Sequence, residues 1–148
     1  MTDQEATKEK TAANYDDLFA TLRRRAISAG FGSLSSAEQT FHAVAVLRSD
    51  LALGAFPLFF DCADERVQRA VGAALSDLGR PDLVDLVDQA RKLWEADAAW
   101  KAEVDAERGL VPPNEARLAE LTDRFLEADD ELAQRLAQWA RARRLIAR

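Results

Sequence analysis

The hydrophobic residues of this 148-residue chain recur mostly every three or four positions, which is the period of an amphipathic helix. A first such stretch covers residues 14–29, with Asn14 placed to cap its N-terminus and Gly30 marking the turn after it. A second begins at Ser35, where Ser35 and Glu38 stand in the spacing of a capping box. No stretch alternates as a strand does. The pattern predicts an all-α protein with about five to seven helices.

The second predicted helix stops at Gly54, and the aromatic-rich segment 56–60 that follows is too hydrophobic for an exposed loop. We interpret this segment as a short buried helix or turn that plugs the core. Further helices are predicted over residues 64–78 and from Pro81, whose missing N–H costs nothing at a first helical position. The expected core residues are Phe41, Leu47, Phe56, Phe59, Val71, Leu86 and Trp94.

Residues 97–108 either continue the helix that begins at Pro81 or form a separate one. From residue 114 onward the pattern is helical again, and a row of apolar residues falls seven positions apart at Leu118, Phe125, Leu132, Trp139 and Ile146. Arg135 interrupts the companion row, so an amphipathic pair of helices is favoured over a coiled coil. The acidic run over residues 127–131 indicates a break between the two helices of this pair.

Length and composition indicate one domain over residues 14–148, preceded by a polar segment, residues 1–13, that we expect to be disordered. The net charge of −6 is unevenly distributed: residues 50–133 hold 20 acidic and nine basic residues, whereas residues 134–148 hold five arginines and no acid. An acidic body argues against direct binding of nucleic acid, because phosphates repel it, and it permits a basic protein as partner. The alternative is a surface whose charge only keeps the protein soluble.

The N-terminal residues have no apolar stretch typical of a signal peptide. The longest uncharged apolar run, residues 51–60, is too short to span a bilayer, which takes about 20 residues. The one cysteine, Cys62, excludes an internal disulfide and fits a reducing compartment. We therefore expect a cytoplasmic protein with no membrane partner.

Sequence motifs for catalysis or cofactor binding are missing: there is no phosphate-binding loop, dinucleotide-binding glycine motif, zinc-protease motif, EF-hand pattern or cysteine pair. The one histidine, His42, lies in mid-helix, and we interpret it as a partly buried structural residue rather than a catalytic base. Cys62 stands among acidic residues, which disfavour a reactive thiolate. We expect no enzymatic activity, no cofactor and no metal site.

One stretch looks like a motif rather than a generic helix, namely residues 47–62, LRSDLALGAFPLFFDC. It resembles the signature of a bacterial helical family similar to the C-terminal domain of a DNA mimic protein. In that signature a helix ends in an acidic and an aliphatic residue, two asparagines, two glycines and a phenylalanine, and a glutamine, two aromatics and an asparagine follow. The matching residues are Asp50, Leu51, Gly54, Phe56, Phe59 and Phe60. The two asparagines, second glycine, glutamine and final asparagine are replaced by Ala52, Leu53, Ala55, Leu58 and Cys62.

The resemblance covers about residues 35–145 and implies an all-helical fold. For function it implies a non-enzymatic DNA mimic that occupies the nucleic-acid-binding surface of a basic DNA-binding protein. The motif residues expected to form the core plug are Asp50, Gly54, Phe56, Phe59 and Phe60. The candidate acidic interaction surface comprises Asp82, Asp85, Asp88, Glu127, Asp129, Asp130 and Glu131. Its first three members recur about every 4.5 Å of helix rise, against about 3.4 Å between phosphates along one DNA strand.

A competing hypothesis is a small-ligand-binding protein or an enzyme. It rests on the aromatic density of segment 56–60, beside which a pocket would be lined by Phe56, Phe59, Phe60 and Trp100.

The C-terminal arginines allow two interpretations. They either complement the dipole of the last helix or dock on the acidic body of a second copy, giving a homodimer. The apolar seam of that dimer would consist of Leu132, Leu136, Trp139 and Ile146.

Overall fold

The computed structural model describes residues 13–104 and 109–147, and over these ranges the chain is all-α, as the hydrophobic pattern predicts. The disorder predicted for residues 1–13 falls, except for residue 13, outside the described residues. The elements in chain order are α2 (Tyr15–Ala29), the short 3-10 helix η1 (Phe31–Ser33), α3 (Ser36–Cys62), α4 (Glu65–Asp77), α5 (Pro81–Glu103), α6 (Glu115–Glu127) and α7 (Asp129–Ala142).

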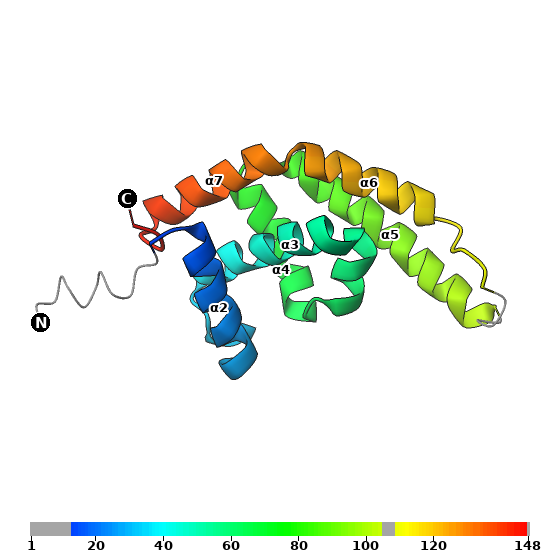
Figure 1. Cartoon of the computed structure of the whole chain (residues 1–148), viewed down its shortest axis with the longest axis horizontal. Coiled ribbons are helices and arrows are strands. Elements are labelled where there is room, and N and C mark those ends of the chain that lie inside the picture. Colours follow the sequence, from blue (N-terminus) through cyan, green and yellow to red (C-terminus); the bar gives the residue numbers. More distant parts are fainter. Residues whose placement is uncertain (1–12, 105–108, 148) are drawn as a thin grey trace, which may run out of the picture.

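Helix α3 runs through the middle of the molecule and contacts α2, α4, α5, α6 and α7 (Figure 1). Helices α6 and α7 follow one another as an arch, with α5 packed alongside α6 and α2 crossing near the start of α3 (Figure 1). The helix that begins at Pro81 continues to Glu103, so residues 97–103 extend it rather than form a separate helix, while residues 105–108 lie outside the described residues. The predicted break in the C-terminal pair lies at Ala128.

The predicted helix starts are confirmed by their caps. The side chain of Asn14 accepts a hydrogen bond from the amide of Asp17 at 3.0 Å. The capping box at the start of α3 is complete: the amide of Glu38 donates to the Ser35 hydroxyl at 3.2 Å, and the amide of Ser35 donates to the Glu38 carboxylate at 2.8 Å. Local sequence therefore fixes where these helices begin.

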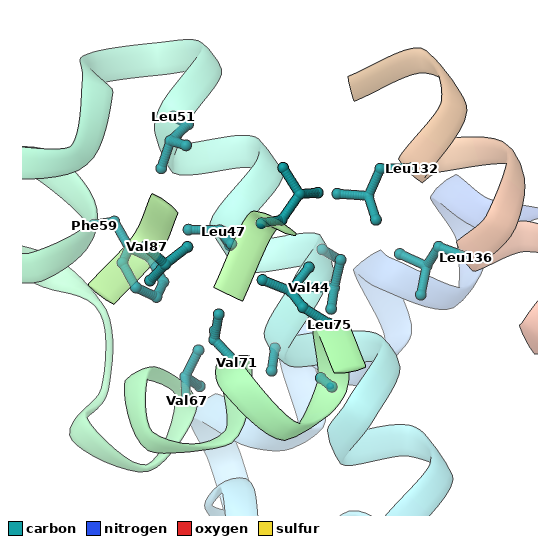
Figure 2. Close-up of a cluster of buried hydrophobic side chains, with 14 of the residues drawn as sticks. Val44, Leu47, Leu51, Phe59, Val67, Val71, Leu75, Val87, Leu132 and Leu136 are labelled. Atoms are coloured by element: carbon teal, nitrogen blue, oxygen red, sulfur yellow. The ribbon is translucent and has the colours of Figure 1, made fainter. Parts of the chain in front are cut away.

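Side chains from α3, α4, α5 and α7 converge in the hydrophobic core (Figure 2). Five of the seven predicted core residues have no exposed surface, namely Phe41, Leu47, Phe56, Phe59 and Val71. Leu86 and Trp94 are less buried than predicted: both are half-buried and pack against the edge of the core. Trp94 stays at this edge because its indole N–H donates to the exposed carboxylate of Asp61 at 3.1 Å.

The apolar seam predicted for a homodimer is not available on the surface. Leu132, Leu136 and Ile146 are at most 2% exposed and belong to the core of this chain. Trp139 is half-buried, with the guanidinium of Arg143 stacked 3.9 Å from its ring centre. The homodimer stays a prediction, but these side chains cannot supply its seam, since exposing them would open the protein's own core.

Helix α3 is the one helix in the described ranges that is long and apolar enough to cross a bilayer by length and composition. Its backbone is not continuous, however, because it breaks at Gly54 and Ala55. Its apolar residues face five neighbouring helices, so its composition is accounted for by its central position.

A polar cluster ties α2, α3 and α7 together. The guanidinium of Arg48 on α3 donates to both carboxylate oxygens of Asp129, the first residue of α7, at 2.7 and 2.9 Å. The same guanidinium lies 5.2 Å from the ring centre of Tyr15 on α2. Burial raises the pKa of Tyr15 and the charge of Arg48 opposes this rise. The pair thus anchors the start of α7 to the middle of α3.

Candidate functional site

The break in α3 lies within the predicted motif. Gly54 has a non-helical backbone, and a Cβ atom there would lie 2.8 Å from the side chain of Leu58, so a larger residue does not fit without movement. Ala55 adopts φ 67° and ψ −176°, a conformation that essentially only glycine tolerates. Ala55 occupies the position of the second glycine in the family signature. The position that the resemblance assigns to a second glycine thus has a backbone conformation typical of glycine, although alanine occupies it.

The helix restarts after this break with help from α6. The amide of Phe56 donates to the hydroxyl of Thr122 at 3.2 Å, and that hydroxyl donates to the carbonyl of Leu118 at 2.8 Å. Thr122 is only 4% exposed, so water cannot easily replace it. Pro57 follows and has no N–H to satisfy. Sequence reasoning missed Thr122, although a threonine among the buried positions of an amphipathic helix is a usable signal of such a contact.

The aromatic plug predicted for residues 56–60 is buried: Phe56 and Phe59 are 0% exposed and Phe60 is 4% exposed. Phe56 packs edge-on against Phe125 of α6, with ring centres 6.2 Å apart. Phe60 lies 5.6 Å from Trp94 between ring centres. These contacts join α3 to α5 and α6, which is a structural role.

The pocket predicted beside the plug does not have the predicted lining. Phe56 and Phe59 are fully enclosed and line no surface hollow. Phe60 and Trp94 instead border an open hollow of about 360 Å³ with Arg91, whose guanidinium covers the Phe60 ring at 5.7 Å. Trp100 is half-buried further along α5.

The seven candidate acidic residues fall into two groups in the structure. Three are held by arginines of the same chain. Arg80 pairs with both Asp82 and Glu131, Arg135 also pairs with Glu131, and Arg48 pairs with Asp129. The hydrogen bonds and charge of Arg80 lower the pKa of Asp82. These arginines connect the start of α5 to the start of α7, so the two parts of the predicted surface are linked.

The other four acids are exposed and form no hydrogen bond or ion pair within residues 13–104 and 109–147. They are Asp85, Asp88, Glu127 and Asp130. Two lie on α5 and two flank the α6–α7 break, next to the elements that Arg80 connects. Sequence reasoning grouped these acids without the arginines between them, because ion pairs such as that of Arg80 with Glu131 span 51 positions of the chain.

The other predicted features have the following positions. His42 is 4% exposed and its Nδ1 has no hydrogen-bond partner among the described residues, so it is more deeply buried than predicted. Cys62 is exposed and free. Across the part of the chain that the structure describes, no three His, Cys, Asp or Glu residues are grouped to hold a metal ion.

The fold and the motif define a class of protein: an all-helical protein whose central helix breaks at a small-residue pair and restarts as a buried aromatic plug. The chain belongs to the DMP19-like protein family, whose model matches residues 32–143. This is the DNA mimic family that the motif resembles, and the matched range is close to the predicted one. Comparisons with curated proteins and with solved structures gave no significant match.

Proposed function

We propose that this protein is a non-enzymatic DNA mimic, which binds the nucleic-acid-binding surface of a basic protein through carboxylates on α5 and at the α6–α7 break. Membership of the DMP19-like family supports this proposal. The observation that carries it beyond the family is the set of exposed carboxylates without partners in the described ranges, two of them Asp85 and Asp88 on α5 and two of them Glu127 and Asp130 at the break.

The arrangement suits phosphate imitation because it is held in place. Arg80 bridges Asp82 on α5 and Glu131 on α7, which restricts how far these helix starts can move apart. Arg48 does the same for Asp129 from the side of α3. The remaining carboxylates are thus presented on braced helices, and a basic partner would meet them without ordering a loop first.

A capture experiment with matched charge variants tests the proposal. The immobilised chain is exposed to native lysate at low salt, and bound proteins are eluted with excess duplex DNA or with high salt. We expect a basic DNA-binding protein that DNA displaces, because both ligands would compete for one surface. Elution by salt but not by DNA would indicate nonspecific charge attraction and contradict the proposal.

The variant removes the four carboxylates without partners: D85N, D88N, E127Q and D130N. The control removes the same number of exposed charges away from α5 and from the α6–α7 break: D16N, D17N, E65Q and E115Q. We expect the first variant to lose the captured protein and the control to keep it. Equal loss in both, or capture of no DNA-displaceable protein by the original chain, would refute the proposed surface.

A further inference from the structure

One feature that the proposed function does not use is a groove of about 440 Å³ where α2, α3 and the start of α4 meet. One wall is the face of α2 that carries Phe19, Arg23 and Ile27, and the other is the face of α3 that carries His42 and Asp50. Small-molecule sites have volumes of about 300–1,000 Å³, so the groove is large enough for one.

Two opposite charges lie in this groove without pairing. Arg23 and Asp50 form no ion pair with each other, and neither has a hydrogen bond to any described residue. The guanidinium of Arg23 has only the face of Phe19 beneath it, at 6.0 Å from the ring centre. Arginines elsewhere in the chain pair readily, as Arg25 does with Glu38 at 2.8 Å. The Arg23 and Asp50 charges, on α2 and α3, thus both line the groove and both remain available to a ligand.

Most of the other residues that line the groove are apolar. Phe31, Val46 and Val67 line it with aromatic and aliphatic surface. Asp64, at the rim, caps α4 by accepting a hydrogen bond from the amide of Arg66 at 2.7 Å. The imidazole of His42 is neutral near pH 7, since burial and then the charge of Arg23 lower its pKa. Asp50 and Arg23 are the charged side chains of the groove that have no hydrogen bond or ion pair with a described residue, and the Ser49 hydroxyl and the exposed Cys62 thiol also line it.

We propose that this groove binds a free α-amino acid with an apolar side chain, whose ammonium group pairs with Asp50 and whose carboxylate pairs with Arg23. A zwitterion carries its two charges on neighbouring atoms, so it satisfies two opposed protein charges that do not meet directly. Its side chain then covers the apolar surface formed by Phe31, Val46 and Val67. This site is separate from the carboxylates of the proposed DNA-mimicking surface.

The burial of the Asp50 carboxylate is unfavourable in the unliganded protein, and this supports a binding role for Asp50. Burial raises the pKa of Asp50, and the charge of Arg23 only partly offsets this effect. A half-buried carboxylate without hydrogen bonds does not stabilise the fold, and an amide in its place would be easier to bury. Asp50→Asn should therefore leave the melting temperature unchanged or raise it while removing the group that binds the ammonium.

Titration calorimetry on the full chain tests the proposal with L-leucine and L-phenylalanine as probes. We expect saturable binding with a Kd of about 1 mM or lower. L-Leucinamide lacks the carboxylate and N-acetyl-L-leucine lacks the ammonium, so each should bind about tenfold more weakly or worse. No binding of either amino acid at about 10 mM would overturn the proposal, as would unweakened binding of both derivatives.

Variants locate the site. Asp50→Asn and Arg23→Gln should each weaken binding about tenfold or more, with the melting temperature retained. The matched control is Arg24→Gln, because Arg24 is the exposed neighbour of Arg23 and does not line the groove. The ring signals of His42, the one histidine, should shift in the NMR spectrum when ligand is added. Wild-type affinity in both groove variants, or an unmoved His42 signal on binding, would overturn the assignment.

Discussion

Two regions along α3 differ in whether their polar groups have hydrogen-bond or ion-pair partners. Where α3 meets α6, the break at residues 54–55 frees an amide, and Thr122 accepts its hydrogen bond. Where α3 meets α2, the Nδ1 of His42 has no partner in the described residues, and Arg23 and Asp50 both line the groove without an ion pair between them. A fold satisfies its buried polar groups wherever stability alone decides. The difference fits a structural role for the first region and the proposed ligand-binding role for the second.

The largest expected effect is a loss of stability when a buried side chain is truncated where α3 packs against α6. Phe56→Ala removes a fully buried ring that packs against Phe60 and Phe125, and it should lower the free energy of unfolding by about 3–5 kcal/mol. Urea denaturation followed by circular dichroism measures this. The control is Leu53→Ala, whose side chain is 78% exposed and which should change stability by less than about 0.5 kcal/mol. Similar effects in the two variants would contradict the buried plug.

Removing one hydrogen bond should have a smaller effect in the same region. Thr122→Val keeps the shape of the side chain but leaves the amide of Phe56 buried without an acceptor, which costs about 1–3 kcal/mol. Thr122→Ser keeps the hydroxyl, so it should retain most of the stability. If the serine variant is as unstable as the valine variant, packing of the methyl group rather than the hydrogen bond holds the break.

Restoring a glycine at the break should stabilise the protein. Ala55→Gly relieves a conformation that costs a residue with a Cβ about 1–3 kcal/mol, against about 0.5–1 kcal/mol of added chain entropy, for a net gain of about 1 kcal/mol. The matched control is Ala52→Gly one turn earlier, in regular helix, which should lose about 0.5–1 kcal/mol. Equal losses at both positions in thermal unfolding would show that Ala55 is not strained.

The groove residue His42 should make the stability of the fold depend on pH. The folded chain holds His42 with its pKa below the ordinary 6.5, so the unfolded chain binds the proton more readily. Stability from this residue is therefore complete above about pH 6.5 and declines as the pH falls towards the folded pKa. Asp50 acts with the opposite sign, since burial raises its pKa from 3.8.

The measurement is the free energy of unfolding at several values between about pH 7 and pH 5, for the original chain and for His42→Gln. The carboxylates titrate alike in both proteins, so the difference between the two curves isolates His42. We expect the original chain to lose more stability on acidification than the variant. Superimposable slopes would show that His42 keeps an ordinary pKa in the fold.

Much of the fold could be predicted from the sequence because its signals are local. The capping box at Ser35, the cap at Asn14 and Pro81 each act within one helical turn, and each begins a helix as predicted. The motif also located the break, since a glycine followed by an aromatic cluster cannot continue a surface helix. Trp94 was placed too deep because its hydrogen bond to Asp61, 33 residues away, is invisible to periodicity.

The candidate sites could be predicted only in part, because their partners come from distant segments. Asp82 and Glu131 were predicted as surface acids, but Arg80 between them was not, and it changes what they offer a partner. The groove was missed entirely. Arg23 and Asp50 lie on different helices, and only the packing of α2 against α3 brings them into one groove. Periodicity gives the face of a helix but not the neighbour that the face meets.

The contacts that complete α3 also set the order in which the protein can fold during synthesis. The partner of Arg48 is made 81 residues later, and the acceptor for the amide of Phe56 is made 66 residues later. At about 5–20 residues per second, the ribosome takes about 4–16 s to supply Asp129 after Arg48. During that interval the most apolar helix of the chain has α2, α4 and α5 to cover it but lacks α6 and α7. The nascent protein therefore depends on being shielded until α6 and α7 arrive, and a shortened chain lacking them would be prone to aggregation.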